Sequence, residues 1–133
     1  DKNNFGSDIF NSAYLNIVLI WNKGIAFGLL SFNESHFYNI LSLIISIIIV
    51  ILIIMSLNSE GFKRYSLLMI VGGALGNLHD RIFFNAVPDF IDFHVGNFHW
   101  FIFNVADIFI TCGVIFMILL ELIGNSIKDN EKI

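Results

Sequence analysis

The sequence predicts a mainly α integral membrane protein, a helical bundle that carries a small outward-facing β-rich element. The chain has 133 residues, of which 56% are hydrophobic and only 14% charged, whereas a soluble domain usually carries about a quarter charged residues. One long stretch without any charge and several short aromatic segments complete the pattern. The net charge is −4 and no run of basic residues occurs, so nucleic acid is not an expected partner, whereas membrane lipids are.

Three stretches are long and apolar enough to cross a bilayer. Residues 40–57 are uncharged over 18 positions and would extend about 27 Å as a helix, close to a hydrocarbon core of about 30 Å. A second span is expected over residues 65–86, although His-Asp-Arg interrupts its last turns. A third is expected over residues 101–123, with Asp107 inside its first turns.

The distribution of basic residues is slightly uneven and indicates how these spans are oriented in the membrane. Lys63 and Arg64 fall in the segment 58–64 between the first two spans, and Lys128 and Lys132 follow the third. Cytoplasmic segments are enriched in Lys and Arg. We therefore expect segment 58–64 to be a cytoplasmic loop and the opposite ends of the spans to face outward.

The outward segments have the composition of ordered structure. "SAYLNIVLIW" (12–21) is rich in β-branched and aromatic residues and too short for a span, which indicates a strand or an interfacial segment. Gly24 and Gly28 follow and permit tight turns. "FIDFHVGNFHWF" (90–101) is dense in aromatic residues, as is typical of a membrane–water interface. The whole chain, residues 1–133, reads as a single domain.

Two acidic residues flank the second outward segment. Pro88 disfavours helical geometry at the residue before it, so the second span is expected to end near Asn85, with Asp89 just beyond the break. Asp107 lies just inside the third span. A short outer hairpin between them would bring both carboxylates to one depth, and ionisable residues at membrane depth are rare and usually functional.

Local structural roles explain each acid equally well when it is taken singly. Asn104 followed three residues later by Asp107 resembles a helix N-cap with an acid at the third position. Asp89 can be a turn residue after the proline. "GGALG" (72–76) predicts close helix packing rather than a phosphate-binding loop, and the lone Cys112 is expected to pack in the apolar span.

Four segments carry a resemblance to a known family: "NKGIAFGLL", "GGALGNLHDR", "VPDFIDFHVGNFHW" and "FNVADIFITCG". In this order and spacing they resemble the lipoprotein signal peptidases (signal peptidase II), bacterial membrane aspartic peptidases. The resemblance runs from about Tyr14 to Gly113. It implies that Asp89 and Asp107 are the catalytic pair. The asparagines and the arginine that it implies for substrate binding and positioning are Asn22, Asn77, Arg81 and Asn104.

The resemblance also implies an activity and a location. The substrate would be a prolipoprotein with a diacylglyceryl group on a cysteine, cleaved on the amino side of that cysteine without any cofactor. The enzyme would be a monomer in the bacterial inner membrane, with its active site near the outer face. The sequence departs from the pattern at Pro88, where the family has a second valine. It also shows three spans where the family has four, so we expect the first span to be missing from this chain.

If the two carboxylates are in contact, the repulsion between like charges disfavours ionisation of both, so they would share one proton. Peptide hydrolysis without a metal needs such a pair, one protonated acid and one ionised base. Which acid holds the proton is open at this stage, because coupled groups titrate as a pair.

Two other classes of function remain. Paired membrane carboxylates also serve proton or cation translocation, and this is the principal alternative. A metallohydrolase would need a ligand group, and the candidates are His79 with Asp80, or Asp92 with His94 and His99. No His-Glu-x-x-His pattern is present, so no metal is expected at the active site. Asp80 can equally be an interfacial charge.

Overall fold

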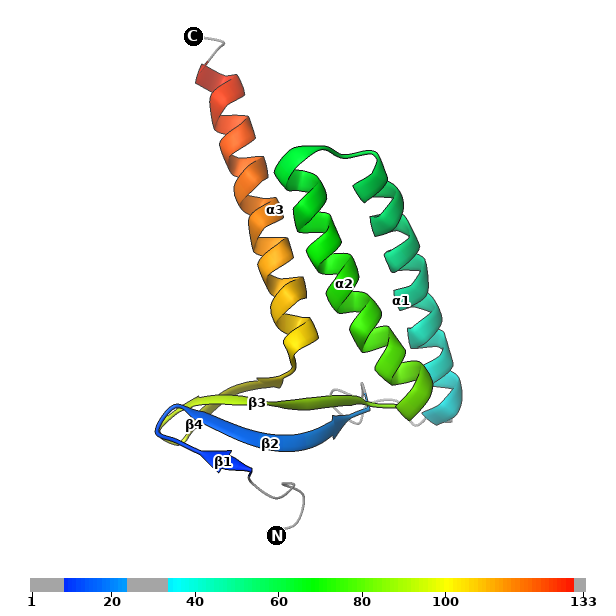
Figure 1. The fold of residues 1–133 in the computed structure, drawn as a ribbon, viewed down its shortest axis with the longest axis vertical. Coiled ribbons are helices and arrows are strands. Elements are labelled where there is room, and N and C mark those ends of the chain that lie inside the picture. The colour runs from blue at the N-terminus through cyan, green and yellow to red at the C-terminus, as the bar shows by residue number, and fades with distance from the viewer. Residues whose placement is uncertain (1–8, 24–33, 131–133) are drawn as a thin grey trace.

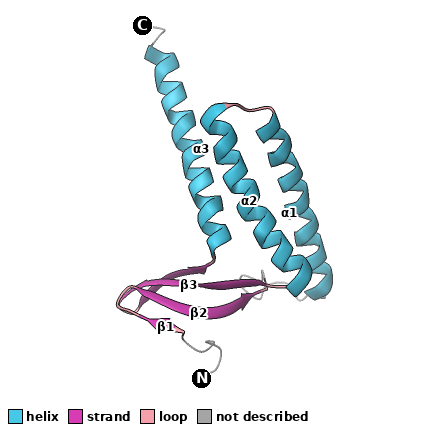
Figure 2. Ribbon diagram, viewed as in Figure 1, coloured by secondary structure: helices cyan, strands magenta, loops and turns pink. Residues whose placement is uncertain are grey.

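The computed structural model describes residues 9–23 and 34–130. Within them lie three long helices and one four-stranded sheet, with the strands gathered at one end of the helices (Figure 2). In chain order the elements are β1 (Phe10–Asn11), β2 (Leu15–Asn22), α1 (Glu34–Leu57), α2 (Gly61–Phe84), β3 (Val87–Val95), β4 (Phe98–Phe103) and α3 (Val105–Asn130). The predicted fold class, membrane-length helices with a small β element, is confirmed.

The apolar parts of the three helices are Tyr38–Leu57, Gly61–Phe84 and Val105–Gly124, each long enough to cross a membrane. The first agrees closely with the predicted span. The second begins before the predicted residue 65, so the connection shrinks to residues 58–60, and Lys63 and Arg64 lie in the first turn of α2 rather than in a loop.

Arg64 explains why the connection is so short. From the first turn of α2, its Nε donates to the carbonyl oxygen of Ser59 at 2.7 Å and lies 3.3 Å from that of Ser56. A cation at the end of α1 satisfies carbonyl groups that have no partner within the helix and complements the helix dipole. The side chain thus ties the two helices together directly.

The third span begins at Val105, not at Phe101. The predicted start was wrong because residues 98–103 form strand β4, which pairs with β3 in a hairpin. Apolar and aromatic residues suit a strand as well as a span. The left-handed Gly96, with φ +60°, lies in the turn of this hairpin.

The predicted break at Pro88 is confirmed in position. Helix α2 ends at Phe84, and Asn85 adopts a left-handed conformation with φ 52° while its N–H donates to the carbonyl oxygen of Arg81 at 3.0 Å. Pro88 then occupies the second position of β3. Asparagine tolerates the left-handed region better than most residues, which suits it to this C-cap.

Helix α2 lies between α1 and α3 (Figure 1). Its contact with α3 is close because glycines line it. A Cβ at Gly73 would collide with the carbonyl oxygen of Ala106, and one at Gly113 would come within 2.7 Å of that of Ser66. The close packing predicted from "GGALG" is therefore confirmed, with Gly113 as a second contact on α3.

The sheet has the order β1-β2-β3-β4, with all neighbours antiparallel. The segment predicted as a strand or interfacial segment is strand β2, and Gly24 and Gly28, which follow it, lie outside the described residues. On β2, Asn22 is paired with Val87 and Asn16 with Asp92. Because side chains alternate along a strand, Asp89 and Asp92 project from opposite faces of β3.

Candidate active site

Asp89 is buried at the start of β3, close to the end of α2. Its side chain is 5% exposed, although it is a charged residue type that is seldom fully buried without partners. Two amides donate to it: Nδ2 of Asn22 to Oδ2 at 2.9 Å, and Nδ2 of Asn104 to Oδ1 at 2.8 Å. The alternative of a turn residue after the proline is wrong, since Asp89 lies inside strand β3 and its carboxylate accepts hydrogen bonds from two side chains.

Asp107 occupies the third position of α3 and has two roles at once. The backbone N–H of Asn104 donates to its Oδ2 at 3.1 Å, while its own N–H donates to Oδ1 of Asn104 at 3.0 Å. This reciprocal pair is a capping box. In addition, Nδ2 of Asn77 donates to Oδ1 of Asp107 at 2.8 Å. The capping interpretation is thus correct, and the same carboxylate also belongs to a network that reaches beyond its own helix.

Asn104 joins the two carboxylates. Its Nδ2 donates both to Oδ1 of Asp89 and, at 3.1 Å, to Oδ1 of Asn77, while its backbone and Oδ1 hold Asp107. The residue is 5% exposed. One residue, through its side-chain amide and its backbone N–H, therefore links the acids at the two ends of the β3–β4 hairpin.

The surroundings of Asp89 favour its neutral form. Burial, the largest effect, raises the pKa of the Asp89 carboxyl above its ordinary value, and the negative charge of Asp107 raises it further. The hydrogen bonds from Asn22 and Asn104 and the positive charge of Arg81 lower it by less. Asp107, by contrast, receives two N–H donors at a helix N-terminus, a position that favours negative charge.

Arg81 lies in the last turn of α2, four residues after Asn77. Its Nη1 lies 3.3 Å from the carbonyl oxygen of Asn77, and its buried Nε has no hydrogen-bond partner among the described residues. The two side chains share one helix face, as their spacing predicted. Asp80 instead lies 3.2 Å from Nδ1 of the exposed His79, which fits the alternative of an interfacial charge.

Each carboxylate opens onto its own cleft. The cleft at Asp89 measures about 590 Å³ and is bordered by Trp21, Lys23 and Phe101, among others. The one at Asp107 measures about 370 Å³ and is mainly apolar, with Phe103, Thr111 and again Phe101 in its wall. Phe101 therefore lies between the two acids' clefts. Sequence reasoning missed it and Lys23, although Lys23 directly follows the motif residue Asn22.

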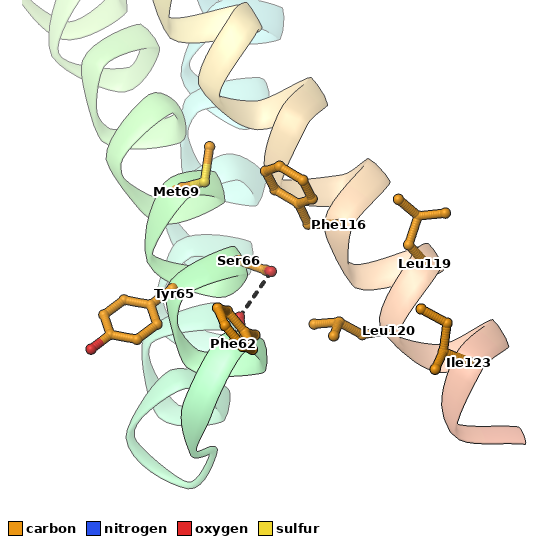
Figure 3. A pocket seen from close by; sticks show the side chains of 8 residues that line it. All are labelled: Phe62, Tyr65, Ser66, Met69, Phe116, Leu119, Leu120 and Ile123. Carbon is orange, nitrogen blue, oxygen red and sulfur yellow. Dashed lines mark hydrogen bonds between the residues drawn. The ribbon is translucent and has the colours of Figure 1, made fainter. Parts of the chain in front are cut away.

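A third cavity, of about 450 Å³, lies at the opposite end of the helices between α2 and α3 (Figure 3). Phenylalanine, leucine and other apolar side chains dominate it. Tyr65 and Ser66 are the hydroxyl-bearing residues among its described lining, and the Ser66 hydroxyl already donates to the carbonyl oxygen of Phe62 at 3.0 Å. None of the described residues that line this cavity is an acid, so they offer no carboxylate for bond cleavage.

The two candidate metal-ligand groups differ in the structure. His79 and Asp80 pair without a third donor among the described residues, whereas Asp92, His94 and His99 come together with ligand atoms within 4.8 Å of one another. That cluster is on the face of β3 opposite to Asp89. All six residues predicted for the active site, in contrast, gather at the junction of β2, α2, β3 and α3.

Comparison with known proteins gives consistent matches. A family model described as signal peptidase (SPase) II matches residues 2–123. The lipoprotein signal peptidase of Pelagibacter ubique (strain HTCC1062) is 54% identical over 125 residues, which are 94% of this chain and 75% of that protein. That of Francisella tularensis subsp. novicida (strain U112) is 41% identical over 122 residues, covering 89% and 76%. A solved structure titled as a bacterial membrane enzyme is 31% identical, with a TM-score of 0.74, covering 91% of this chain and 78% of that one.

Proposed function

Because the chain belongs to the signal peptidase II family, we propose that it is an aspartic peptidase that removes signal peptides from prolipoproteins. The substrate is a prolipoprotein with a diacylglyceryl-modified cysteine, and the bond cleaved is on the amino side of that cysteine. The observation that carries the proposal is that one buried residue, Asn104, connects the two acids: its side-chain amide donates to the Asp89 carboxylate and its backbone N–H donates to that of Asp107.

The environments of the two acids support different roles for them. Asp89 holds the shared proton, since burial raises its pKa. Asp107 is the ionised base, since backbone and amide N–H groups at a helix N-terminus stabilise its charge. Pairs of acids whose environments separate them in this way perform acid and base chemistry at one pH.

The reaction then balances without any further reagent. Asp107 takes a proton from a water molecule as the water oxygen bonds to the scissile carbonyl carbon, and Asp89 gives its proton to the carbonyl oxygen. In the second step the C–N bond breaks, Asp107 returns its proton to the leaving nitrogen, and Asp89 recovers a proton from a hydroxyl of the diol. The pair ends in its starting state.

The remaining residues place the substrate. Arg81 carries a buried Nε that lacks a partner among the described residues, so it can donate to a peptide carbonyl oxygen. A peptide that crosses Phe101 would lie in the mixed polar and apolar cleft of Asp89 on one side and the mainly apolar cleft of Asp107 on the other. The apolar cleft, against the start of α3, suits a lipid-modified residue.

The proposed location is the bacterial inner membrane, with the sheet and the acids at the outer face. Two observations support it: the three membrane-length helices, and the placement of Lys63 and Arg64 at the end of the helices remote from the sheet. We propose that the protein acts as a monomer, since one chain already holds both acids and the asparagines that connect them.

The test is cleavage of a synthetic prolipoprotein peptide by the purified chain in detergent. Mass spectrometry of the products should place the cut directly before the diacylglyceryl cysteine, and the same peptide without the lipid should be cut poorly. Turnover should persist in the presence of a chelator. A cut elsewhere, or activity restored only by added metal, would contradict the aspartic mechanism.

A further inference from the structure

A second cluster of ionisable side chains lies away from the active site, on the β3–β4 hairpin. Nδ1 of His99 lies 2.9 Å from Oδ2 of Asp92. The ring of His94 stacks on that of His99, with centroids 5.1 Å apart and an interplanar angle of 21°. One ligand atom from each of the three residues lies within 4.8 Å of the others.

The hairpin register brings these residues together. His94 on β3 is directly opposite His99 on β4, and the register shifts between Asp92 and His94. Asp92 and His94 are two residues apart on one strand and so share a face. This is the face opposite to Asp89, which separates the cluster from the catalytic pair.

His94 carries the observation that a structural role does not explain. The residue is 9% exposed, and its buried Nδ1 has no hydrogen-bond partner in the described part of the chain. A buried polar atom without a partner is costly. Asp92 beside it is 4% exposed, whereas the side chain of His99 is 53% exposed, so the cluster is enclosed on the β3 side and open to solvent on the β4 side.

We propose that Asp92, His94 and His99 form a binding site for a divalent transition cation of the Zn²⁺ class. Two imidazole nitrogens and one carboxylate oxygen are a common ligand set for Zn²⁺, with water in the fourth position. Tetrahedral ligands about 2.0–2.1 Å from zinc lie about 3.3 Å apart, so the most distant pair must approach by about 1.5 Å. The exposed His99 can supply this movement by side-chain rotation.

The ion takes the place of a proton. Nδ1 of His99 lies 3.0 Å and 2.9 Å from the two carboxylate oxygens of Asp92, so these two groups are already in contact. A bound cation needs the neutral imidazole lone pair, so binding releases any proton that occupies the ligand nitrogen to solvent. The cation then cross-links β3 to β4. Its role is structural, because the site lies on the face of the sheet that does not carry Asp89.

The full chain is purified in detergent without a histidine tag and titrated with Zn²⁺ by calorimetry. One ion per chain should bind with a Kd of about 1 µM or tighter, and the unfolding temperature should rise with Zn²⁺ and fall again with a chelator. Co²⁺ should give the intense visible absorption of a tetrahedral site. Mg²⁺ and Ca²⁺ should not compete.

Three variants assign the site. His99→Gln, which changes an exposed side chain, should weaken Zn²⁺ binding by at least about 10-fold, and Asp92→Asn should do the same. His79→Gln is the matched control, because it removes another histidine that pairs with a carboxylate but has no third donor, and its binding should equal that of the unchanged chain. Absence of Zn²⁺ binding by the unchanged chain, or equal binding by His99→Gln, overturns the proposal. Turnover per folded molecule should not depend on Zn²⁺ and is measured separately.

Discussion

Replacement of each active-site acid by asparagine should give two different outcomes for stability and one for activity. Asp89→Asn and Asp107→Asn keep nearly the volume of the side chain and remove its acid–base function. Loss of general acid–base chemistry lowers turnover by about 10²–10⁴-fold. Both variants should therefore be nearly inactive, and the double variant little worse than either, because residues that act as a unit are not additive.

The hydrogen bonds distinguish the two variants in stability. Asp107 accepts from Asn77 and from the backbone of Asn104, and asparagine retains one acceptor oxygen. Losing one bond to a charged group costs about 1.5–3 kcal/mol, and losing the charge at the helix start about 0.3–1 kcal/mol. We expect Asp107→Asn to lose about 2 kcal/mol in the free energy of unfolding.

Asp89→Asn should not lose stability at neutral pH. The raised pKa of Asp89 means that its folded state favours the protonated form. The stabilising contribution of Asp89 is therefore complete at pH values below its pKa in the unfolded chain, and it is lost as the pH rises through its pKa in the folded chain. An uncharged asparagine avoids that loss, and the exposed amide of Asn22 can rotate to present its oxygen to the new N–H group.

The assay is turnover per folded molecule on a lipid-modified prolipoprotein peptide, with thermal unfolding recorded on the same preparations. The expected order of stability is Asp89→Asn at or above the unchanged chain, and Asp107→Asn below it. Near-normal turnover in either single variant would refute the shared-proton mechanism. Equal stability of the two variants would refute the capping contribution instead.

Three further predictions follow from the fold and the site. Asn22→Ala removes a hydrogen bond that lowers the pKa of Asp89, so the alkaline limb of the pH profile of kcat/KM should move to higher pH. A limb that stays in place or moves to lower pH would contradict the assignment of the proton to Asp89. Gly73→Ala should lower the free energy of unfolding by about 1–3 kcal/mol, because the new Cβ overpacks against α3. Gly72→Ala, where the new Cβ meets open space, should raise it by up to about 1 kcal/mol, and thermal unfolding measures both changes. Cysteines placed at Ser59 and Asn97, in a background without the native cysteine, should label from opposite sides of the membrane, and same-side labelling would rule out the topology.

The sequence predicted the helices and the candidate acids more fully than it predicted the strands. Long apolar stretches and a proline break indicate spans directly, and Asp89 and Asp107 stand out because they interrupt apolar surroundings. Phe101 was assigned to a span because aromatic residues suit both a strand and a bilayer; only pairing with β3 decides between them. For Asp107, local pattern offered capping and chemistry as alternatives, but a carboxylate has enough acceptor sites for both.

The cluster of Asp92, His94 and His99 shows a limit of a different kind. Its residues were identified in the sequence, but their spacing could not reveal that a register shift in the hairpin would stack the two rings. Asn104 is similar. Its role as a helix cap is a local pattern, whereas its contact with Asp89 depends on how β3 and α3 meet.

The position of the two acids at either end of the β3–β4 hairpin also sets the moment in biosynthesis when the enzyme becomes competent. A growing chain that has inserted α2 already carries Asn77 and Arg81, and it soon adds Asp89, yet it has neither the second acid nor the amide that links the pair. Both arrive with the first turn of α3. Proteolytic activity is therefore expected only after that helix has formed, and a nascent chain that still lacks α3 should not cut substrates near its insertion site.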